Sequence, residues 1–161
     1  MSTSTLIQDL SSTSVGCSAR RKVETYWASA AILVGQWVTL DQTKTGVERS
    51  KYVTVATSAA AATTMAVGVA ITAVTADEAT AGAVVEVVVA GYVEDAYANS
   101  AGAATVKVVA GAQMTMGAGT AVLLHEVAGV HTQGQAIGYA LEVAGATTTA
   151  RVDCIVTCSP I

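Results

Sequence analysis

The residues best suited to acid–base or metal chemistry are two histidines near the C-terminal end of the chain. His125 and His131 are the only histidines among 161 residues. The segment between them predicts a hairpin that turns at Ala128-Gly129, which would place His131 opposite His125 or Glu126, depending on the register of the two strands. A metal site would need at least one further ligand nearby, and the neighbouring sequence supplies none. We therefore expect ordinary hairpin side chains and no metal site.

Other arrangements that could support catalysis are incomplete. The serines gather near the N-terminus, and none stands in the G-x-S-x-G pattern that exposes a hydrolase nucleophile. The glycine-rich stretch 111–119 lacks the G-K-[ST] ending that cradles phosphate. Asp77-Glu78 and Glu94-Asp95 are sequence neighbours, and adjacent side chains in a strand point to opposite faces, so they make poor catalytic pairs. The sequence predicts that the protein is not an enzyme and has no catalytic residues and no cofactor.

The three cysteines do not form a complete disulfide framework, because their number is odd. Cys154 and Cys158 also lack the C-x2-C spacing and the histidine ligands of a zinc site. We expect them, together with Cys17, to be buried or half-buried thiols in a reducing compartment. Cys154 alternates with valines in its segment and should behave as a small hydrophobic residue.

Composition excludes several further classes of protein. Charged residues are only 12% of the chain and the net charge is −4, which argues against binding to nucleic acid, because that needs clustered Lys and Arg. The longest weakly polar stretch, 59–76, contains four threonines and a glycine and does not predict a membrane-spanning helix. The first ten residues lack the basic and apolar regions of a signal peptide, so we expect synthesis in a host cytoplasm.

The elements that would position any site are short strands arranged in two similar halves. Segments such as 51–55, 85–89, 105–108 and 152–156 alternate valine with polar residues, as half-buried strands do. Three blocks recur in the same order, matching 35–41 with 119–125, 66–71 with 136–141, and 85–89 with 152–156. Gly68 and Gly138 lie at the centre of the second block, where a strand glycine marks a bulge or a close approach of backbones. Thr75 and Glu78 have the spacing of a capping box, with Gly82 beyond it, and predict a short helix.

These patterns predict an all-β fold, a duplicated antiparallel β-sandwich or partly closed barrel with an extended N-terminal arm. The arm covers residues 1–25. A single β-rich domain covers 26–161 and is made of two related halves, at about 30–92 and 105–158.

The paired A-[VI]-G-[VY]-A-[IL] segments, each followed by an alternating valine strand, resemble the capsid cement or head decoration proteins of tailed bacteriophages. The segments are Val67–Ile71 and Ile137–Leu141, and the resemblance covers about 30–158. It implies a virion protein without catalytic residues, a β-rich homotrimer on the outer surface of a head built from a separate major capsid protein. A phage tail or fibre domain, or a carbohydrate-binding β-module, is the alternative; a carbohydrate site would need exposed aromatic residues such as Trp27 or Trp37.

The arm holds the residues that we expect to contact a capsid. It has too few apolar residues to form a core of its own, but it carries a small apolar cluster and the densest positive charge in the chain. The apolar cluster could fill a groove on a neighbouring subunit, and the basic residues could pair with carboxylates of the capsid. The candidate contact residues are Leu6, Ile7, Leu10, Arg20, Arg21 and Lys22.

Overall fold

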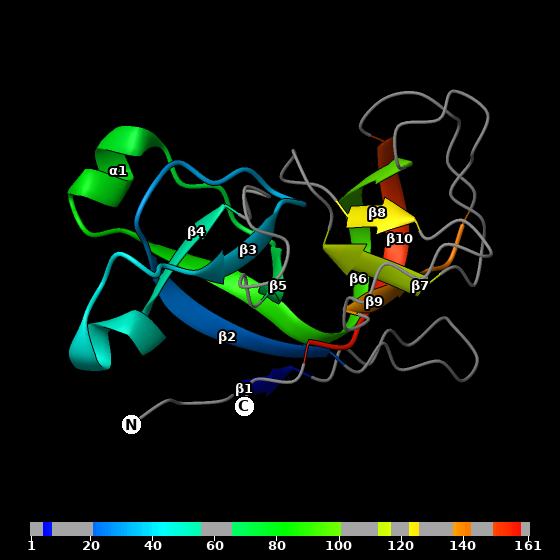
Figure 1. The fold of residues 1–161 in the computed structure, drawn as a ribbon, viewed down its shortest axis with the longest axis horizontal. Helices are drawn as coiled ribbons and strands as arrows, with labels where there is room; N and C mark the ends of the chain where they lie inside the picture. The colour runs from blue at the N-terminus through cyan, green and yellow to red at the C-terminus, as the bar shows by residue number, and fades with distance from the viewer. Residues whose placement is uncertain are drawn as a thin grey trace.

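The computed structural model describes residues 5–7, 21–55, 66–100, 113–116, 123–125, 137–142 and 150–158. All strands in these ranges belong to one sheet, which coils into two lobes (Figure 1). The strands are β1 (Thr5–Ile7), β2 (Arg21–Ala28), β3 (Trp37–Leu40), β4 (Tyr52–Val55), β5 (Ala66–Ala70), β6 (Val84–Ser100), β7 (Gln113–Met116), β8 (Leu123–His125), β9 (Gly138–Ala140) and β10 (Ala150–Val156); a 3-10 helix η1 (Gly46–Ser50) and a helix α1 (Ala76–Thr80) lie between them.

The first lobe is a closed cycle of strand pairings, which we call ring 1. Starting at β2, the neighbours are β4, β3, β5 and the first part of β6, and β6 then pairs with β2 again. Closing the sheet in this way gives each of these five strands a partner on both sides. Ring 1 lies on the left in Figure 1, below α1.

The second lobe, ring 2, repeats this cycle with the rest of the chain. The last part of β6 pairs with β8, followed by β7, β9 and β10, and β10 returns to β6. β6 is therefore a member of both rings. Gly91 pairs with Arg21 in ring 1 and with Val156 in ring 2, so the two cycles share this residue.

The registers of the two rings correspond residue by residue. In ring 1, Val38 pairs with Gly68, and in ring 2, Met114 pairs with Gly138. β3 therefore corresponds to β7, and the predicted match of segment 35–41 with 119–125 is wrong. The correct counterpart of segment 37–40, W-V-T-L, is segment 113–116, Q-M-T-M. The other two predicted blocks agree with the registers, because Val69 pairs with Val88 as Tyr139 pairs with Ile155.

The prediction of an all-β fold is confirmed, but the sheet is mixed rather than antiparallel throughout. β2 runs parallel to β4, and β6 runs parallel to β8. Counted along the chain, the parallel pair of each ring joins its first strand to its third, β2 to β4 in ring 1 and β6 to β8 in ring 2, and this pair closes the cycle. The predicted arm also ends too late, because β2 begins at Arg21 and Val23 already belongs to the core. The predicted strand 105–108 lies outside the described residues.

The core consists of two clusters that use matching positions of the two rings. Inside ring 1, Val85, Val87 and Val89 of β6 point inward from alternate positions. Their counterparts in ring 2 are Val152, Cys154 and Val156 of β10, which are equally buried. The ring 2 cluster also includes residues from the outer wall of ring 1, so the same apolar cluster fills ring 2 and fastens it to ring 1.

Trp37 is the largest side chain that this junction buries, and it is 0% exposed. Its indole Nε1 donates a hydrogen bond to the carbonyl of Tyr97 at 3.1 Å. It belongs to the same core cluster as Ala96 and Ala98, whose small side chains leave room inside ring 2. In ring 1 the position matching Ala96 is occupied by Tyr26, which supplies aromatic bulk from within its own ring.

Both motif glycines are required by close backbone contacts. A Cβ on Gly68 would overlap the carbonyl oxygen of Val88, and a Cβ on Gly138 would lie 2.7 Å from the carbonyl oxygen of Ile155. These oxygens belong to corresponding residues of β6 and β10. The prediction of a close approach at both glycines is confirmed, and this approach lets β5 and β9 cross closely over their neighbours.

The predicted capping box is present at α1. Thr75 Oγ1 accepts a hydrogen bond from the backbone N–H of Glu78 at 3.3 Å, and a Glu78 carboxylate oxygen accepts one from the Thr75 N–H at 2.8 Å. Gly82 follows with φ +84°, a conformation that favours glycine. The pair Asp77-Glu78 is thus part of a helix start.

We predict that Gly68→Ala destabilises the protein by about 3 kcal/mol, because the added methyl must displace the backbone of β6. Gly46→Ala is the control. A Cβ on Gly46 would have no other atom within 4 Å, but the φ of this residue is +59°, so the backbone strain should cost about 1 kcal/mol. Denaturant unfolding of the variants measures both values. Equal losses for the two variants would contradict the role of Gly68 in ring closure.

Candidate functional site

The structure brings together two groups of candidate residues that are separate in the sequence. β1 pairs with β2 in antiparallel register, so that Leu6 lies opposite Lys22 and Ile7 lies opposite Arg21. Part of the arm therefore extends the sheet beside the basic residues instead of lying apart from the domain. Leu10 and Arg20 lie outside the described residues.

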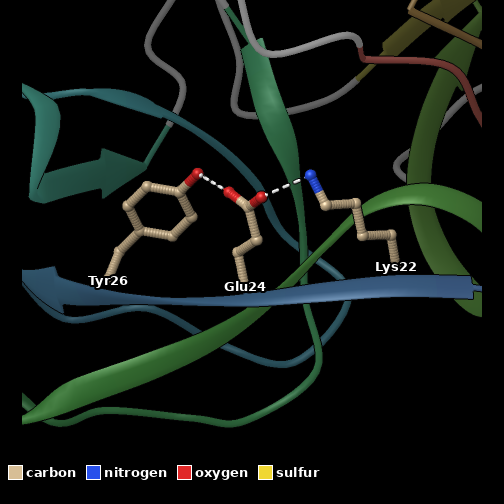
Figure 2. A network of polar contacts seen from close by, with 3 residues as sticks. All are labelled: Lys22, Glu24 and Tyr26. Atoms are coloured by element: carbon tan, nitrogen blue, oxygen red, sulfur yellow. Dashed lines mark hydrogen bonds and ion pairs between the residues drawn. The ribbon is translucent and has the colours of Figure 1, made fainter. Parts of the chain in front are cut away.

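A polar network occupies the face of β2 that points into ring 1. Lys22, Glu24 and Tyr26 follow one another at alternate positions and their side chains lie on the same side of the strand (Figure 2). Lys22 Nζ is 2.7 Å from Glu24 Oε1, and the Tyr26 hydroxyl donates to Glu24 Oε2 at 2.6 Å. Lys22 thus has an ionic partner within its own chain, which reduces the charge that it offers to another molecule.

Burial and this network act on the same ionisable groups. Burial raises the pKa of Tyr26, and its hydrogen bond to the Glu24 carboxylate raises it further. Burial alone would also raise the pKa of Glu24, but hydrogen bonds from Lys22 and Tyr26 and the charge of Lys22 bring it below its ordinary value. Glu24 therefore stays ionised at neutral pH with its negative charge held at the end of ring 1.

A second surface, the aromatic ledge, lies on the outer side of ring 1 and consists of Trp27, Tyr52 and Lys44. Trp27 is 41% exposed and stacks on Tyr52 with ring centroids 6.3 Å apart. The Lys44 ammonium lies 4.5 Å from the centroid of the Tyr52 ring. Trp27 and Trp37 thus differ in exposure, since Trp37 is fully buried and lies in the core. The sequence could not separate them, because residue type alone does not give the face of the strand.

The outer side of ring 2 carries a third group of polar residues. The Tyr92 hydroxyl donates to Asp153 Oδ2 at 2.6 Å, and the Asp153 backbone N–H donates to Glu142 Oε1 at 2.9 Å. The hydrogen bond to Asp153 raises the pKa of Tyr92. Arg151 donates to the Tyr97 hydroxyl at 2.9 Å and also lies over the Tyr97 ring. Asp153 corresponds in register to Glu86 of ring 1.

The residues that could carry out chemistry do not assemble in the described part of the chain. His125 is in β8, whereas His131 and the predicted hairpin turn lie outside the described ranges. In the ranges that the structure covers, no three His, Cys, Asp or Glu residues could hold a metal ion together. The predictions of no enzyme, no metal and no cofactor remain predictions.

Two of the cysteines are buried and free of disulfides. Cys154 and Cys158 both belong to the ring 2 cluster, and burial raises the pKa of each thiol to about 12. The Cys158 Sγ lies 3.6 Å from the carbonyl oxygen of Ile137 and donates a weak hydrogen bond to it. Cys17 lies outside the described residues.

Comparison with known proteins does not assign a family. No protein-family model and no curated protein sequence matches the chain. Among the described residues, no helix is both long and apolar enough to cross a bilayer.

We predict that Glu24→Gln lowers stability at neutral pH by about 1 kcal/mol, because the ion pair with Lys22 is lost. The folded-state pKa of Glu24 is depressed, so its contribution is present above the ordinary pKa of 4.5 and is lost as pH falls through the depressed value. The difference between wild type and variant should therefore shrink on acidification. Denaturant unfolding between pH 3 and 7 measures it; Glu48→Gln, at an exposed position, is the control. A difference independent of pH would contradict the role of Glu24.

We predict that Cys154→Val folds normally, with a change in stability within about 1.5 kcal/mol, because the matching position in ring 1 is Val87. In the wild type, the raised pKa and burial should make Cys154 slow to react with iodoacetamide at pH 8, because the thiolate is the reactive form. Peptide mass spectrometry before and after denaturation measures the labelling. Rapid native labelling at Cys154 would contradict the assigned burial.

Proposed function

We propose that this chain is a structural virion protein, a capsid cement or decoration protein. It binds the outer surface of a phage head as a homotrimer and stabilises contacts between subunits of the major capsid protein. The observation that supports this proposal is the position of the two segments that resemble that family. Val67–Ile71 and Ile137–Leu141 occupy the same place in ring 1 and ring 2, with a glycine under a neighbouring backbone in each.

The strand pair β1–β2 is the surface that we assign to the capsid. Leu6 and Ile7 lie in β1, the outermost strand in the order of the sheet, beside Arg21 and Lys22. Apolar and basic residues together suit a capsid face that combines a groove with carboxylates. Lys22 is paired with Glu24, which offsets its charge. Of the two basic residues in this strand pair, Arg21 therefore supplies more of the attraction to carboxylates of the capsid. Leu10 and Arg20, the other two candidate contact residues, lie outside the described residues.

The aromatic ledge supports the alternative function, a phage tail or fibre domain or a carbohydrate-binding β-module. Sugar rings stack on exposed aromatic faces, and Trp27 presents such a face beside Tyr52. The two functions differ in their location on a particle. Mass spectrometry of purified particles and heads separates them, since a cement protein is abundant on heads freed of tails. A gene next to that of the major capsid protein would also favour the cement function.

We predict that deletion of residues 2–20 leaves the β-domain folded but weakens attachment to undecorated heads. The deletion stops before β2, because removing Arg21 and Lys22 would shorten a strand of ring 1. Circular dichroism checks the fold, and titration onto heads at low and moderate salt measures occupancy. Equal occupancy for deleted and full-length protein would remove the arm from the proposed surface.

The single variant Arg21→Gln sharpens the same experiment. It should weaken attachment roughly threefold at low salt and less at moderate salt, because exposed charge pairs are worth below about 1 kcal/mol and are screened. Arg49→Gln on η1 is the matched control and should bind as the wild type does.

A further inference from the structure

We propose that the outer wall of ring 2, formed by Tyr92, Tyr139 and Ile155, is the face on which a second copy of this chain packs. The inference deepens the self-association that forms part of the proposed function and rests on it. It assigns a surface to that association, and it follows from a comparison of the two rings.

The corresponding wall of ring 1 is covered within the chain. Val23, Val69 and Val88 lie on β2, β5 and β6, and they form a connected patch because Val88 pairs with both of the others. Each is at most 8% exposed. They belong to the cluster that includes Ile137 and Cys158 of the second half, so ring 2 is what covers this wall.

The wall of ring 2 has the same construction, but no described residue buries it as ring 2 buries the wall of ring 1. Ile155 pairs with Tyr92 and with Tyr139, as Val88 pairs with Val23 and Val69. Tyr139 is 40% exposed, and Leu141, two positions further along the chain, is 45% exposed. Tyr92 and Ile155 are half-buried. Large apolar and aromatic side chains thus stand at positions where the first half buries valines.

The Tyr92 hydroxyl already has its partner in Asp153, so that this hydroxyl stays paired when another surface packs on the Tyr92 ring. Exposed apolar groups of this kind mark contact surfaces when they form a continuous patch. In ring 1 the cover comes from a related unit, ring 2, and a second copy of the chain offers a related unit for the wall of ring 2.

The charges around the wall favour a head-to-tail contact between copies. Glu142 and Asp153 lie beside the wall, joined by a hydrogen bond from the Asp153 backbone. Packing this wall on itself about a two-fold axis would bring these carboxylates toward their own copies. A different surface of the second copy, which lacks these carboxylates, avoids this repulsion. Head-to-tail contacts close into a ring when the rotation between successive copies is a whole fraction of a turn, and a rotation of one third gives the proposed trimer.

The test compares Tyr139→Glu and Leu141→Glu with Val47→Glu. Val47 is 75% exposed and lies on η1, away from the wall, so its variant adds the same charge at an unrelated apolar position. Light scattering and sedimentation over a concentration series measure association, and circular dichroism verifies folding. We expect the wild type and Val47→Glu to form the same oligomer, and the two wall variants to dissociate at least tenfold more readily. Unchanged association of the folded wall variants would overturn the assignment, and so would equal weakening by Val47→Glu.

A second measurement does not depend on tolerance of a charge. A photoreactive phenylalanine analogue at position 139 should give an adduct with the mass of two chains, and the same group at position 47 should not. A wild type that stays monomeric at all concentrations and on heads would overturn the assigned face, whereas its binding to heads would still support the capsid function. An oligomer that binds no heads, but crosslinks through position 139, would support the face and contradict the capsid function.

Discussion

Both rings depend on the hydrogen bonds that β6 makes along its two edges. β6 pairs with β2 and β5 in ring 1 and with β8 and β10 in ring 2. Each ring needs one part of this strand to close. The strand changes rings at Gly91, whose φ of +101° suits glycine, and it contains a second irregularity at Asp95, with φ +55°. These two residues bend one long strand enough to serve two curved sheets.

The two rings keep a common backbone register while filling their interiors differently. Val87 and Cys154 are equivalent, and so are Tyr26 and Ala96. The second exchange removes an aromatic ring from the interior of ring 2, and Trp37 from ring 1 joins the cluster in that space. The same side chain, Trp37, therefore joins the two rings and packs in the interior of ring 2. The volume that ring 2 lacks at Ala96 is filled by a residue of ring 1.

The sequence predicts the strands well, because alternation of valine with polar residues is a local property. It also predicts the capping box at Thr75, for which the cause is again local. The crowded glycines are evident because they interrupt strand patterns, although the atoms that crowd them belong to neighbouring strands. The sequence does not predict which strands pair, since alternation says nothing about partners, and neither parallel pairing follows from it. The false match of 35–41 with 119–125 rests on common residue types, whereas the true counterpart shares a threonine flanked by large apolar residues, a signal that was available.

The candidate site was predictable only in part. The basic and apolar residues of the arm are evident in the sequence as candidates, but the pairing of β1 with β2 is not, because it joins two separate segments of the chain. The Lys22–Glu24 ion pair follows from their spacing in a strand once β2 is known to begin at Arg21. Exposure of Trp27 and burial of Trp37 required the three-dimensional structure, because each depends on which face of its ring meets a neighbour.

The sharing of β6 also determines how the molecule bears mechanical load. A pull that separates the two rings along β6 acts parallel to β2 and β10, which lie antiparallel to it on either side of Gly91. Their hydrogen bonds then resist in shear, so that many must break together, whereas a peeling force would open them one at a time. We propose that the protein works on a shell under internal pressure. There, β6 resists the tension that would pull the two rings apart.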